Sequence, residues 1–210
     1  MKSSRHLVAR LAATVRRRLW QATRGFGKPV PLETWEQEYR AGAWDYLSNL
    51  EELAHYMMIV GYATQAAAQP DILDVGCGSG HLLRRLPPSG FHSYLGVDFS
   101  PEAIARASRL QTEGAQFVRG DFETWVPPQS VDVIVFNESL YYSRRPGELV
   151  ARYARHLRAN GKIIVSMFKA SGHRFIWKSL DSVLLRIDGV QIARDDGRRW
   201  QVALFAPRPA

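Results

Sequence analysis

The sequence is short of cysteine, of long hydrophobic runs and, over its first 28 residues, of acidic side chains. Cys77 is the single cysteine, so no disulfide can form within the chain, which suits a reducing compartment. No apolar run reaches the roughly 18 residues that a membrane-spanning helix needs. No group of His, Cys, Asp and Glu has the spacing of a metal site. We therefore expect a cytoplasmic protein that binds no metal.

Residues 1–28 form a basic arm that carries eight of the 28 basic residues and no acidic residue. Residues 29–210 hold the other twenty basic residues and all twenty acidic ones, so the arm supplies the whole net charge of +8. Apolar residues recur every four positions between its arginines, as on a basic amphipathic helix. Such a helix could dock on the protein, bind a membrane surface or a partner, or act as a transit peptide. The charge gives no indication of nucleic-acid binding by the neutral remainder.

The length suits one α/β domain preceded by smaller segments. A Gly/Pro-rich linker at 25–31 ends the arm. Aromatic residues are dense in the segment that follows, and helical spacing extends over 50–68 before Pro70. We divide the chain into the arm (1–28), a helical cap or lid segment (29–70) and a core (71–210).

Apolar runs alternate with helical patterns after Pro70. The runs that predict strands are 72–75, 94–97, 116–118, 131–136 and 162–168, and the helical patterns lie near 80–86, 101–112 and 147–158. This alternation is typical of a doubly wound, mainly parallel sheet with helices on both faces. Near the end of the chain, alternating residues flank Asp195-Asp196-Gly197, which predicts an antiparallel hairpin.

The stretch DILDVGCGSG, residues 71–80, indicates the cofactor. Its glycines, Gly76, Gly78 and Gly80, are one position tighter than the G-x-G-x-x-G loop that receives a pyrophosphate. Asp74 precedes them, and a carboxylate there would repel a phosphate but bind an ammonium group. The loop therefore favours S-adenosylmethionine, which has a cationic amine and no phosphate. A nicotinamide dinucleotide is the alternative and would make the protein an oxidoreductase.

Two further acidic positions follow later strands. Asp98 comes 18 residues after Gly80, where a carboxylate can accept hydrogen bonds from both hydroxyls of a ribose. Phe99 is placed to lie against an adenine. Asp121 and Phe122 follow the third apolar run, where the carboxylate can bind the adenine amino group. Together with the glycine loop, these positions predict a nucleoside-containing cofactor.

These motifs resemble those of the class I, Rossmann-like S-adenosylmethionine-dependent methyltransferases over roughly residues 71–206. The matching stretches are DILDVGCGSG, LGVDFS, GDF, VDVIVFNESLYY and LRANGKIIVS. The resemblance implies a seven-stranded sheet whose last strand is antiparallel. It also implies that the acid and the glycine loop hold the methionine part of the cofactor. Within that loop we interpret Cys77 as a small packing residue rather than a nucleophile. Asn137 and Tyr39 complete our set of candidate cofactor-binding residues.

The methyl acceptor is expected beyond the carboxyl ends of the strands, where the fourth apolar run ends in NESLYY, 137–142. Amino-methylating nucleic-acid enzymes of this class usually have N/D-P-P-Y/F there, so we expect no nucleic-acid substrate. E-x-L-Y-Y resembles, more weakly, the nodulation methyltransferases that N-methylate chitooligosaccharides and sugar methyltransferases. Glu138 is a candidate base or amine-holding residue, or simply a helix-capping acid. Tyr141 is the second candidate catalytic residue.

Aromatic residues of the lid segment have two interpretations. Trp35, Tyr39 and Trp44 could close over the cofactor's sulfonium by cation–π attraction, or pack in the core. We interpret His173, after the fifth apolar run, as a surface-loop residue. The prediction is a methyltransferase that acts on nitrogen or oxygen of a small molecule or glycan, with an amino sugar favoured. A module that binds the cofactor without catalysis is the remaining alternative.

Overall fold

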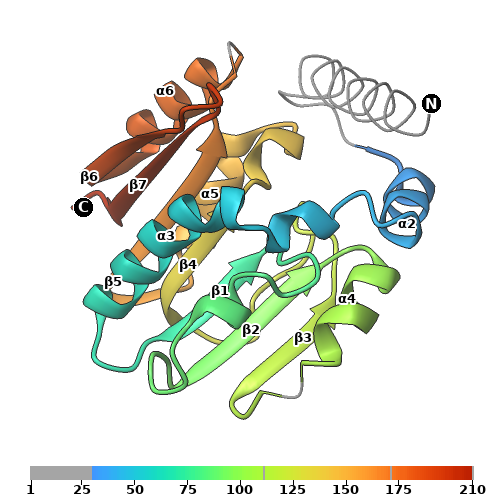
Figure 1. Cartoon of the computed structure of the whole chain (residues 1–210). Coiled ribbons are helices and arrows are strands. Elements are labelled where there is room, and N and C mark those ends of the chain that lie inside the picture. The colour runs from blue at the N-terminus through green and yellow to red at the C-terminus, as the bar shows by residue number, and fades with distance from the viewer. Residues whose placement is uncertain (1–29, 111, 171, 210) are drawn as a thin grey trace, which may run out of the picture.

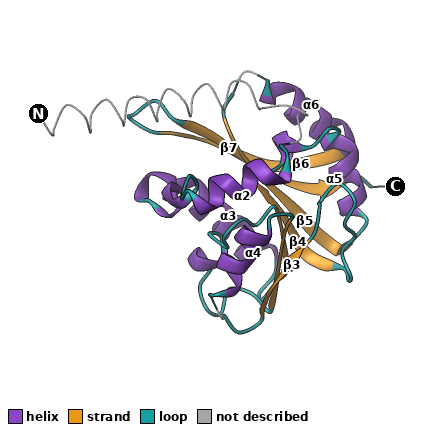
Figure 2. Cartoon of the chain, turned by 90° about the vertical axis from the view of Figure 1, so that its right-hand side faces the viewer, coloured by secondary structure: helices purple, strands orange, loops and turns teal. Residues whose placement is uncertain are grey.

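The structure is a computed structural model, and it describes residues 30–110, 112–170 and 172–209. A single twisted sheet runs through its centre, and helices lie on both sides of it (Figures 1 and 2). The basic arm, for which the sequence predicts an amphipathic helix, lies outside the described residues. Among the described residues, no helix is both long and apolar enough to cross a membrane.

Seven strands form the sheet, as predicted. They are β1 (Asp71–Val75), β2 (Ser93–Asp98), β3 (Ala115–Arg119), β4 (Val131–Asn137), β5 (Leu157–Phe168), β6 (Leu184–Ala193) and β7 (Arg199–Pro207). Their order across the sheet is β3-β2-β1-β4-β5-β7-β6. Strands β1 to β5 pair in parallel, and β7 is antiparallel to both β5 and β6. The predicted mainly parallel sheet with an antiparallel C-terminal hairpin is confirmed.

Helices cover both faces of the sheet. They are α2 (Leu32–Arg40), α3 (Leu53–Ala66), α4 (Pro101–Ser108), α5 (Pro146–Ala154) and α6 (His173–Val183), with the short 3-10 turns η1 (Asp45–Ser48), η2 (Leu50–Glu52), η3 (Leu83–Arg85) and η4 (Leu140–Tyr142). Figure 2 shows α3 and α4 on one face and α5 and α6 on the other. Helix α2 lies farther out, beside α4.

Alternating residues of the central strands divide the core into two layers. In β1, Ile72 packs with the residues of α3, whereas Leu73 and Val75 pack with those of α5 and α6. All five residues of β1 are buried. A strand that is covered on both faces favours apolar side chains on both faces, which explains why the central strands are mostly apolar in the sequence. In β1 the exceptions are Asp71 and Asp74, whose buried carboxyl groups accept hydrogen bonds.

The structure differs from the local predictions at four helical segments. The pattern at 80–86 yields only the single turn η3, because Pro87 and Pro88 follow it. Proline disfavours helical backbone in the preceding residue, and Leu86 is extended, with ψ of 135°. The helix predicted near 101–112 ends earlier, at Ser108.

The region after β4 holds the other two differences. The helix predicted near 147–158 ends at Ala154, because Leu157 already pairs with Val131 as the first residue of β5. Helix α6 was not predicted, although its buried residues recur at positions i, i+3, i+4 and i+7, the spacing of one helix face. Those residues are His173, Ile176, Trp177 and Leu180. His173, interpreted above as a surface-loop residue, is therefore part of the core.

Candidate active site

A cavity of about 520 Å³ opens at the carboxyl ends of the central strands. Its walls come from the loops after β1 to β5, from the lid segment and from the start of β7. The predicted site residues that line it are Tyr39, Asp74, Gly76, Cys77, Gly78, Asp98, Phe99, Asp121, Phe122, Asn137, Glu138 and Tyr141. Gly80 is the predicted site residue that does not line it.

The glycine loop has left-handed backbone at all three glycines. At Gly76, a Cβ would lie 2.6 Å from the Cβ of Ser139, so no side chain fits. At Gly80, a Cβ would lie 2.7 Å from Leu110 Cδ1, so this glycine permits close packing behind the loop rather than at the cavity. Cys77 is buried, and burial raises the pKa of its thiol well above the usual value. A neutral, buried thiol agrees with the prediction of a packing residue.

Asp74 lines the cavity and carries a buried oxygen that has no hydrogen-bond partner among the described residues. Its Oδ2 accepts a hydrogen bond from the Tyr94 hydroxyl at 2.5 Å, whereas its buried Oδ1 has no hydrogen-bond partner among the described residues. Burial raises the pKa of this carboxyl from 3.8 to about 7. A buried acceptor of this kind is costly without a donor, so it suits a ligand that brings one, such as an ammonium group.

Asp98 lies beside the glycine loop and is held by backbone groups. The Gly78 N–H donates to Oδ2 and the Ser100 N–H donates to Oδ1, each at 3.0 Å. Each carboxylate oxygen keeps a second lone pair with which it can accept a hydroxyl. Burial raises the pKa of this carboxyl as well.

Asp121 and Phe122 lie in the loop after β3. The Glu123 N–H donates to Asp121 Oδ1 at 2.9 Å. Arg152 of α5 fixes this loop from behind, because its guanidinium donates to the carbonyl oxygens of Phe122 and Glu123 at 2.6 Å. The loop is therefore placed by α5, on the opposite face of the sheet from the lid segment.

Aromatic side chains of the lid segment pack together over the cavity. The Trp35 ring lies 5.1 Å from Trp44 and 6.3 Å from Tyr39, and meets the Tyr142 ring edge-on at 5.0 Å. Glu36 secures α2 beneath them, since its Oε1 accepts hydrogen bonds from Ser100 Oγ and Glu102 N. The two interpretations of these aromatics are compatible, because the same rings pack on one another and line the cavity.

Glu138 follows β4 in a left-handed conformation, with φ of 54°. Its Oε2 accepts hydrogen bonds from the Phe168 N–H at 3.0 Å and the Tyr141 hydroxyl at 3.2 Å. Its buried Oε1 has no hydrogen-bond partner among the described residues. Burial raises the pKa of this carboxyl from 4.5 to about 8. These contacts join Glu138 to β5 and do not cap a helix, so the capping interpretation does not fit.

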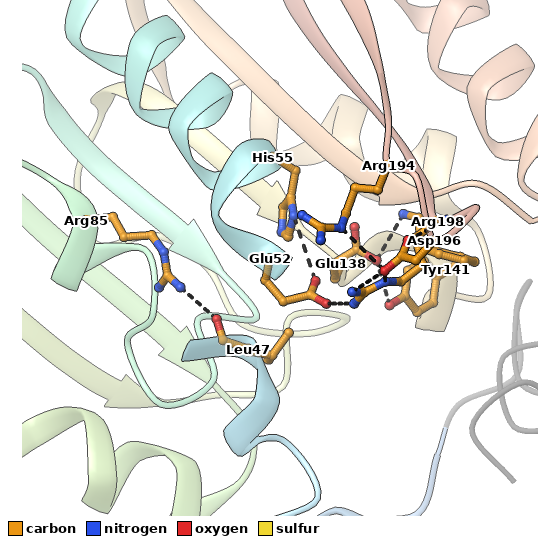
Figure 3. Close-up of polar contacts among 10 residues, drawn as sticks. Leu47, Glu52, His55, Arg85, Glu138, Tyr141, Arg194, Asp196 and Arg198 are labelled. Atoms are coloured by element: carbon orange, nitrogen blue, oxygen red, sulfur yellow. Dashed lines mark hydrogen bonds and ion pairs between the residues drawn. The ribbon is translucent and has the colours of Figure 1, made fainter. Parts of the chain in front are cut away.

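Two charged residues that line the cavity, Glu52 and Arg198, were not predicted from the sequence. Arg198 of the hairpin donates to Glu52 Oε1 at 2.7 Å and also binds Asp196 (Figure 3). Glu52 and Arg198 both line the cavity, although 146 positions separate them in the sequence. No local pattern links such residues, so the pair could only be found once the hairpin was placed beside α3.

The comparisons with known proteins identify the family. A methyltransferase domain family matches residues 8–207. The chain belongs to this family. Its cofactor is S-adenosylmethionine, as predicted, and the oxygen of Asp74 that has no partner among the described residues fits the ammonium group of that molecule. The nicotinamide alternative is set aside.

Curated relatives match part of this methyltransferase. Trans-aconitate 2-methyltransferase of Acidovorax sp. is 36% identical over 100 residues, which are 46% of this chain and 37% of that protein. Malonyl-acyl-carrier-protein O-methyltransferase of Paenibacillus sp. is 29% identical over 110 residues, or 49% of this chain and 40% of that protein. The matches thus span about two fifths of the length of these relatives.

Solved structures share the fold over most of the chain. The N-methyltransferase NodS of Bradyrhizobium japonicum, solved with S-adenosylhomocysteine, has a TM-score of 0.71 and 17% identity, covering 83% of this chain and 98% of that one. The 1,6-didemethyltoxoflavin N1-methyltransferase of Burkholderia thailandensis has a TM-score of 0.68 and 17% identity, covering 85% and 87%. The resemblance to nodulation-type enzymes is confirmed at the level of the fold.

Proposed function

We propose that the protein methylates a nucleophilic nitrogen or oxygen of a small molecule, with an amine as the favoured acceptor. The observation that carries the proposal is Glu138, which lines the cavity with Oε2 held by two donors and Oε1 left without a partner among the described residues. S-adenosylmethionine supplies an activated methyl group when bound. A fixed carboxylate can take the proton of an alcohol or hold an amine in line for transfer.

We assign the predicted cofactor residues to one end of the cavity, the cofactor end, formed by the loops after β1, β2 and β3. Asp74 and the glycine loop would bind the methionine part, and Asp98 would accept the ribose hydroxyls. Residues assigned to the adenine and the sulfonium surroundings are Phe99, Asp121, Phe122, Asn137 and Tyr39. The opposite part, bounded by Glu138, Phe168 and Arg198, is the acceptor end.

The charge of the cavity favours an amine over an anionic acceptor. Its carboxylates are Glu52, Asp74, Asp98, Asp121, Glu123 and Glu138, and its arginines are Arg144 and Arg198. Arg198 is already engaged by Glu52 and Asp196, whereas Arg144 is exposed. Within the described part of the chain, carboxyl groups therefore outnumber guanidinium groups in the lining. Burial raises the pKa of Glu138 to about 8, and neither its neutral nor its charged form offers an anionic acceptor a counter-charge. The names of two relatives, for trans-aconitate and malonyl-acyl-carrier protein, imply acceptors that carry negative charge. This lining suits such anionic acceptors less well than it suits an amine.

An amino sugar is the first acceptor to test. The solved structures named above are both described as N-methyltransferases, which supports a nitrogen acceptor, and the E-x-L-Y-Y motif supports an amino sugar or a glycan that carries one. The membrane contact of the arm, the cytoplasmic location and the division at residues 28 and 70 stay predictions.

The test is transfer of a labelled methyl group to a panel of small molecules. Calorimetry first measures the affinity for S-adenosylmethionine, with NAD as the negative control. Glucosamine and chitosan oligomers are then compared with their N-acetylated forms, which lack the free amine, and with trans-aconitate. We expect transfer to the free amines alone. Transfer to trans-aconitate would contradict the amine proposal, and cofactor binding without transfer to any acceptor would favour a module without catalysis.

A further inference from the structure

Four residues form a closed ring of contacts at the acceptor end. The Phe168 N–H donates to Glu138 Oε2 at 3.0 Å, and the Phe168 carbonyl oxygen lies 2.6 Å from His173 Nδ1. The Tyr141 hydroxyl donates to the same Oε2 at 3.2 Å, and its ring stacks on that of His173 with centroids 4.8 Å apart and planes 9° apart. Figure 3 shows the contact between Glu138 and Tyr141. Two routes therefore join His173 to one carboxylate oxygen.

His173 is held rigidly at its end of both routes. It is the first residue of α6 and is 5% exposed. A carbonyl oxygen can only accept, so the proton of the imidazole is on Nδ1. Burial lowers the pKa of His173, which keeps the ring neutral near pH 7. The Nδ1–H of the ring therefore donates to the Phe168 carbonyl oxygen, and the face of the ring stacks on Tyr141.

We propose that His173 is a positioning residue that fixes Glu138 so that its Oε1 faces the methyl acceptor. This inference rests on the proposed function of Glu138. Rotation of the carboxylate would break the hydrogen bonds from both Phe168 and Tyr141 to Oε2. His173 contacts both donor residues, Phe168 at its carbonyl oxygen and Tyr141 at its ring. Orientation of a reacting group within a fraction of an ångström is a large part of catalysis by alignment.

The donors on Oε2 also affect the protonation of Glu138. Both hydrogen bonds favour the carboxylate form and so oppose the rise in pKa that burial causes. The titratable groups that act on it are Glu52 of η2, which raises its pKa, and the hydroxyls of Tyr56, Tyr141 and Tyr142, which stay neutral near pH 7. If His173 no longer fixed the two donors, the pKa of Glu138 would rise.

A matched pair of variants tests the two routes. His173→Phe keeps a ring to stack on Tyr141 but loses the donor to Phe168, whereas His173→Asn keeps a donor near the Nδ1 position. The Glu138 carboxyl is titrated by ¹³C NMR in the full chain, and turnover is measured with glucosamine. In His173→Phe we expect the Glu138 pKa to rise by about half a unit or more and kcat to fall about tenfold, with cofactor affinity within twofold. In His173→Asn, the pKa of Glu138 and kcat should both stay close to their wild-type values.

Equal losses in the two variants, with an unchanged Glu138 pKa, would show that His173 serves packing only and would overturn the proposal. If His173→Phe does not fold, Tyr141→Phe is the second variant. It removes the hydroxyl that donates to Glu138 Oε2 and keeps a ring to stack on His173, so it should raise the pKa of Glu138. An unmoved pKa in that variant would also overturn the proposal.

The Glu138→Gln background separates this inference from the proposed function. If His173 acts through Glu138, His173→Phe should change kcat less than twofold once Glu138 is Gln. A tenfold loss in both backgrounds would overturn the positioning role and leave that of Glu138 intact. Wild-type turnover of Glu138→Gln itself would overturn the proposed function of Glu138, and with it the reason to position that residue.

Discussion

The two ends of the cavity are built in different ways. At the cofactor end, Asp98 is held by backbone N–H groups of the neighbouring glycine loop and the loop after β2, and Asp74 by Tyr94 of the adjacent strand. At the acceptor end, Glu138 is held by Phe168 of β5 and Tyr141 of η4, and Arg198 of the hairpin binds Glu52 of η2. The contacts of Asp74 and Asp98 come from two neighbouring strands and the loops that follow them, whereas the acceptor end depends on elements that lie far apart in the sequence.

This difference suggests that cofactor binding and acceptor specificity depend on different parts of the fold. A site built from backbone groups of adjacent strands tolerates changes elsewhere, because β1 and β2 pair along their whole length. A site built from side chains of distant elements changes when any of those elements shifts. The same cofactor end can therefore serve enzymes with different acceptors, since specificity lies on loops and added elements.

The effect with the largest upper bound is expected at the acceptor end, from Glu138→Gln, which keeps the size and loses the base. For an alcohol acceptor, a positioned base contributes about 10²–10⁴-fold, so turnover should fall by that factor. For an amine, the neutral form is already nucleophilic and the loss should be smaller, with partial recovery as pH rises. We expect the smaller loss. Steady-state kinetics across pH measure it, and cofactor affinity by calorimetry is the control.

At the cofactor end, Asp74→Asn should weaken S-adenosylmethionine binding by roughly 1.5–3 kcal/mol, the usual contribution of a hydrogen bond to a charged group. The Asn oxygen can still accept from Tyr94, so the fold should persist. Calorimetry measures the change, and Asp98→Ala should give a similar loss through the ribose. Unchanged affinity in a folded Asp74→Asn variant would refute the assignment of Asp74 to the ammonium.

The same variant should stabilise the protein without cofactor. An acid whose pKa is raised by folding contributes most to the free energy of unfolding at pH values below its pKa in the unfolded chain. That contribution is lost as the pH rises from the unfolded pKa to the folded pKa. For Asp74 this window runs from 3.8 to about 7, so Asn should raise the free energy of unfolding at pH 8 by up to about 4 kcal/mol. Urea unfolding at pH 4 and pH 8 measures it. A gain at both pH values would point to another cause.

The cofactor end could be predicted from the sequence because its determinants are local. Left-handed backbone restricts Gly76 to glycine, and the strand-end position of Asp74 and Asp98 follows from the apolar runs before them. The spacing of the loop predicted that Gly80 would bind the cofactor. In the structure Gly80 packs against Leu110 and Phe117 and does not line the cavity. A glycine can be required for packing as firmly as for a ligand.

The acceptor end could be predicted only in part. Glu138 and Tyr141 stand out because they follow β4 directly, whereas Glu52, Arg198 and His173 become neighbours through the placement of η2, the hairpin and α6. The helical spacing of His173 with Ile176 and Leu180 was available in the sequence and would have placed His173 in the core. The pairing of Glu52 with Arg198 had no such signal.

Arg198→Met should have a moderate effect that is confined to the acceptor end. It removes one partner of the buried Glu52 carboxylate, but its side chain can still cover Trp200. We expect the free energy of unfolding to fall by about 1–2 kcal/mol, with cofactor affinity unchanged within twofold. Arg194→Met, which removes only a 3.5 Å contact with Asp196, is the matched control and should be near neutral. A loss of cofactor affinity in Arg198→Met would show that the two ends are coupled.

The smallest effect is a pH dependence of cofactor affinity at the cofactor end. Burial holds the pKa of Asp74 at about 7 in the free protein. A bound ammonium group would favour the carboxylate and lower this pKa, so binding below pH 7 must release a proton. Affinity should therefore rise on the order of tenfold between pH 6 and pH 7.5 and level off near pH 8, where α-amino groups themselves lose a proton.

Calorimetry in buffers of different ionisation enthalpy tests this directly, because the apparent enthalpy reports the released proton. Wild type should release close to one proton at pH 6 and fewer at pH 7.5, whereas Asp74→Asn should release fewer at both and show a flatter affinity profile. Glu138→Gln is the matched control at the acceptor end. If that variant, rather than Asp74→Asn, flattened the profile, the proton would come from the acceptor end, and the two ends would be linked through the charge of the cofactor.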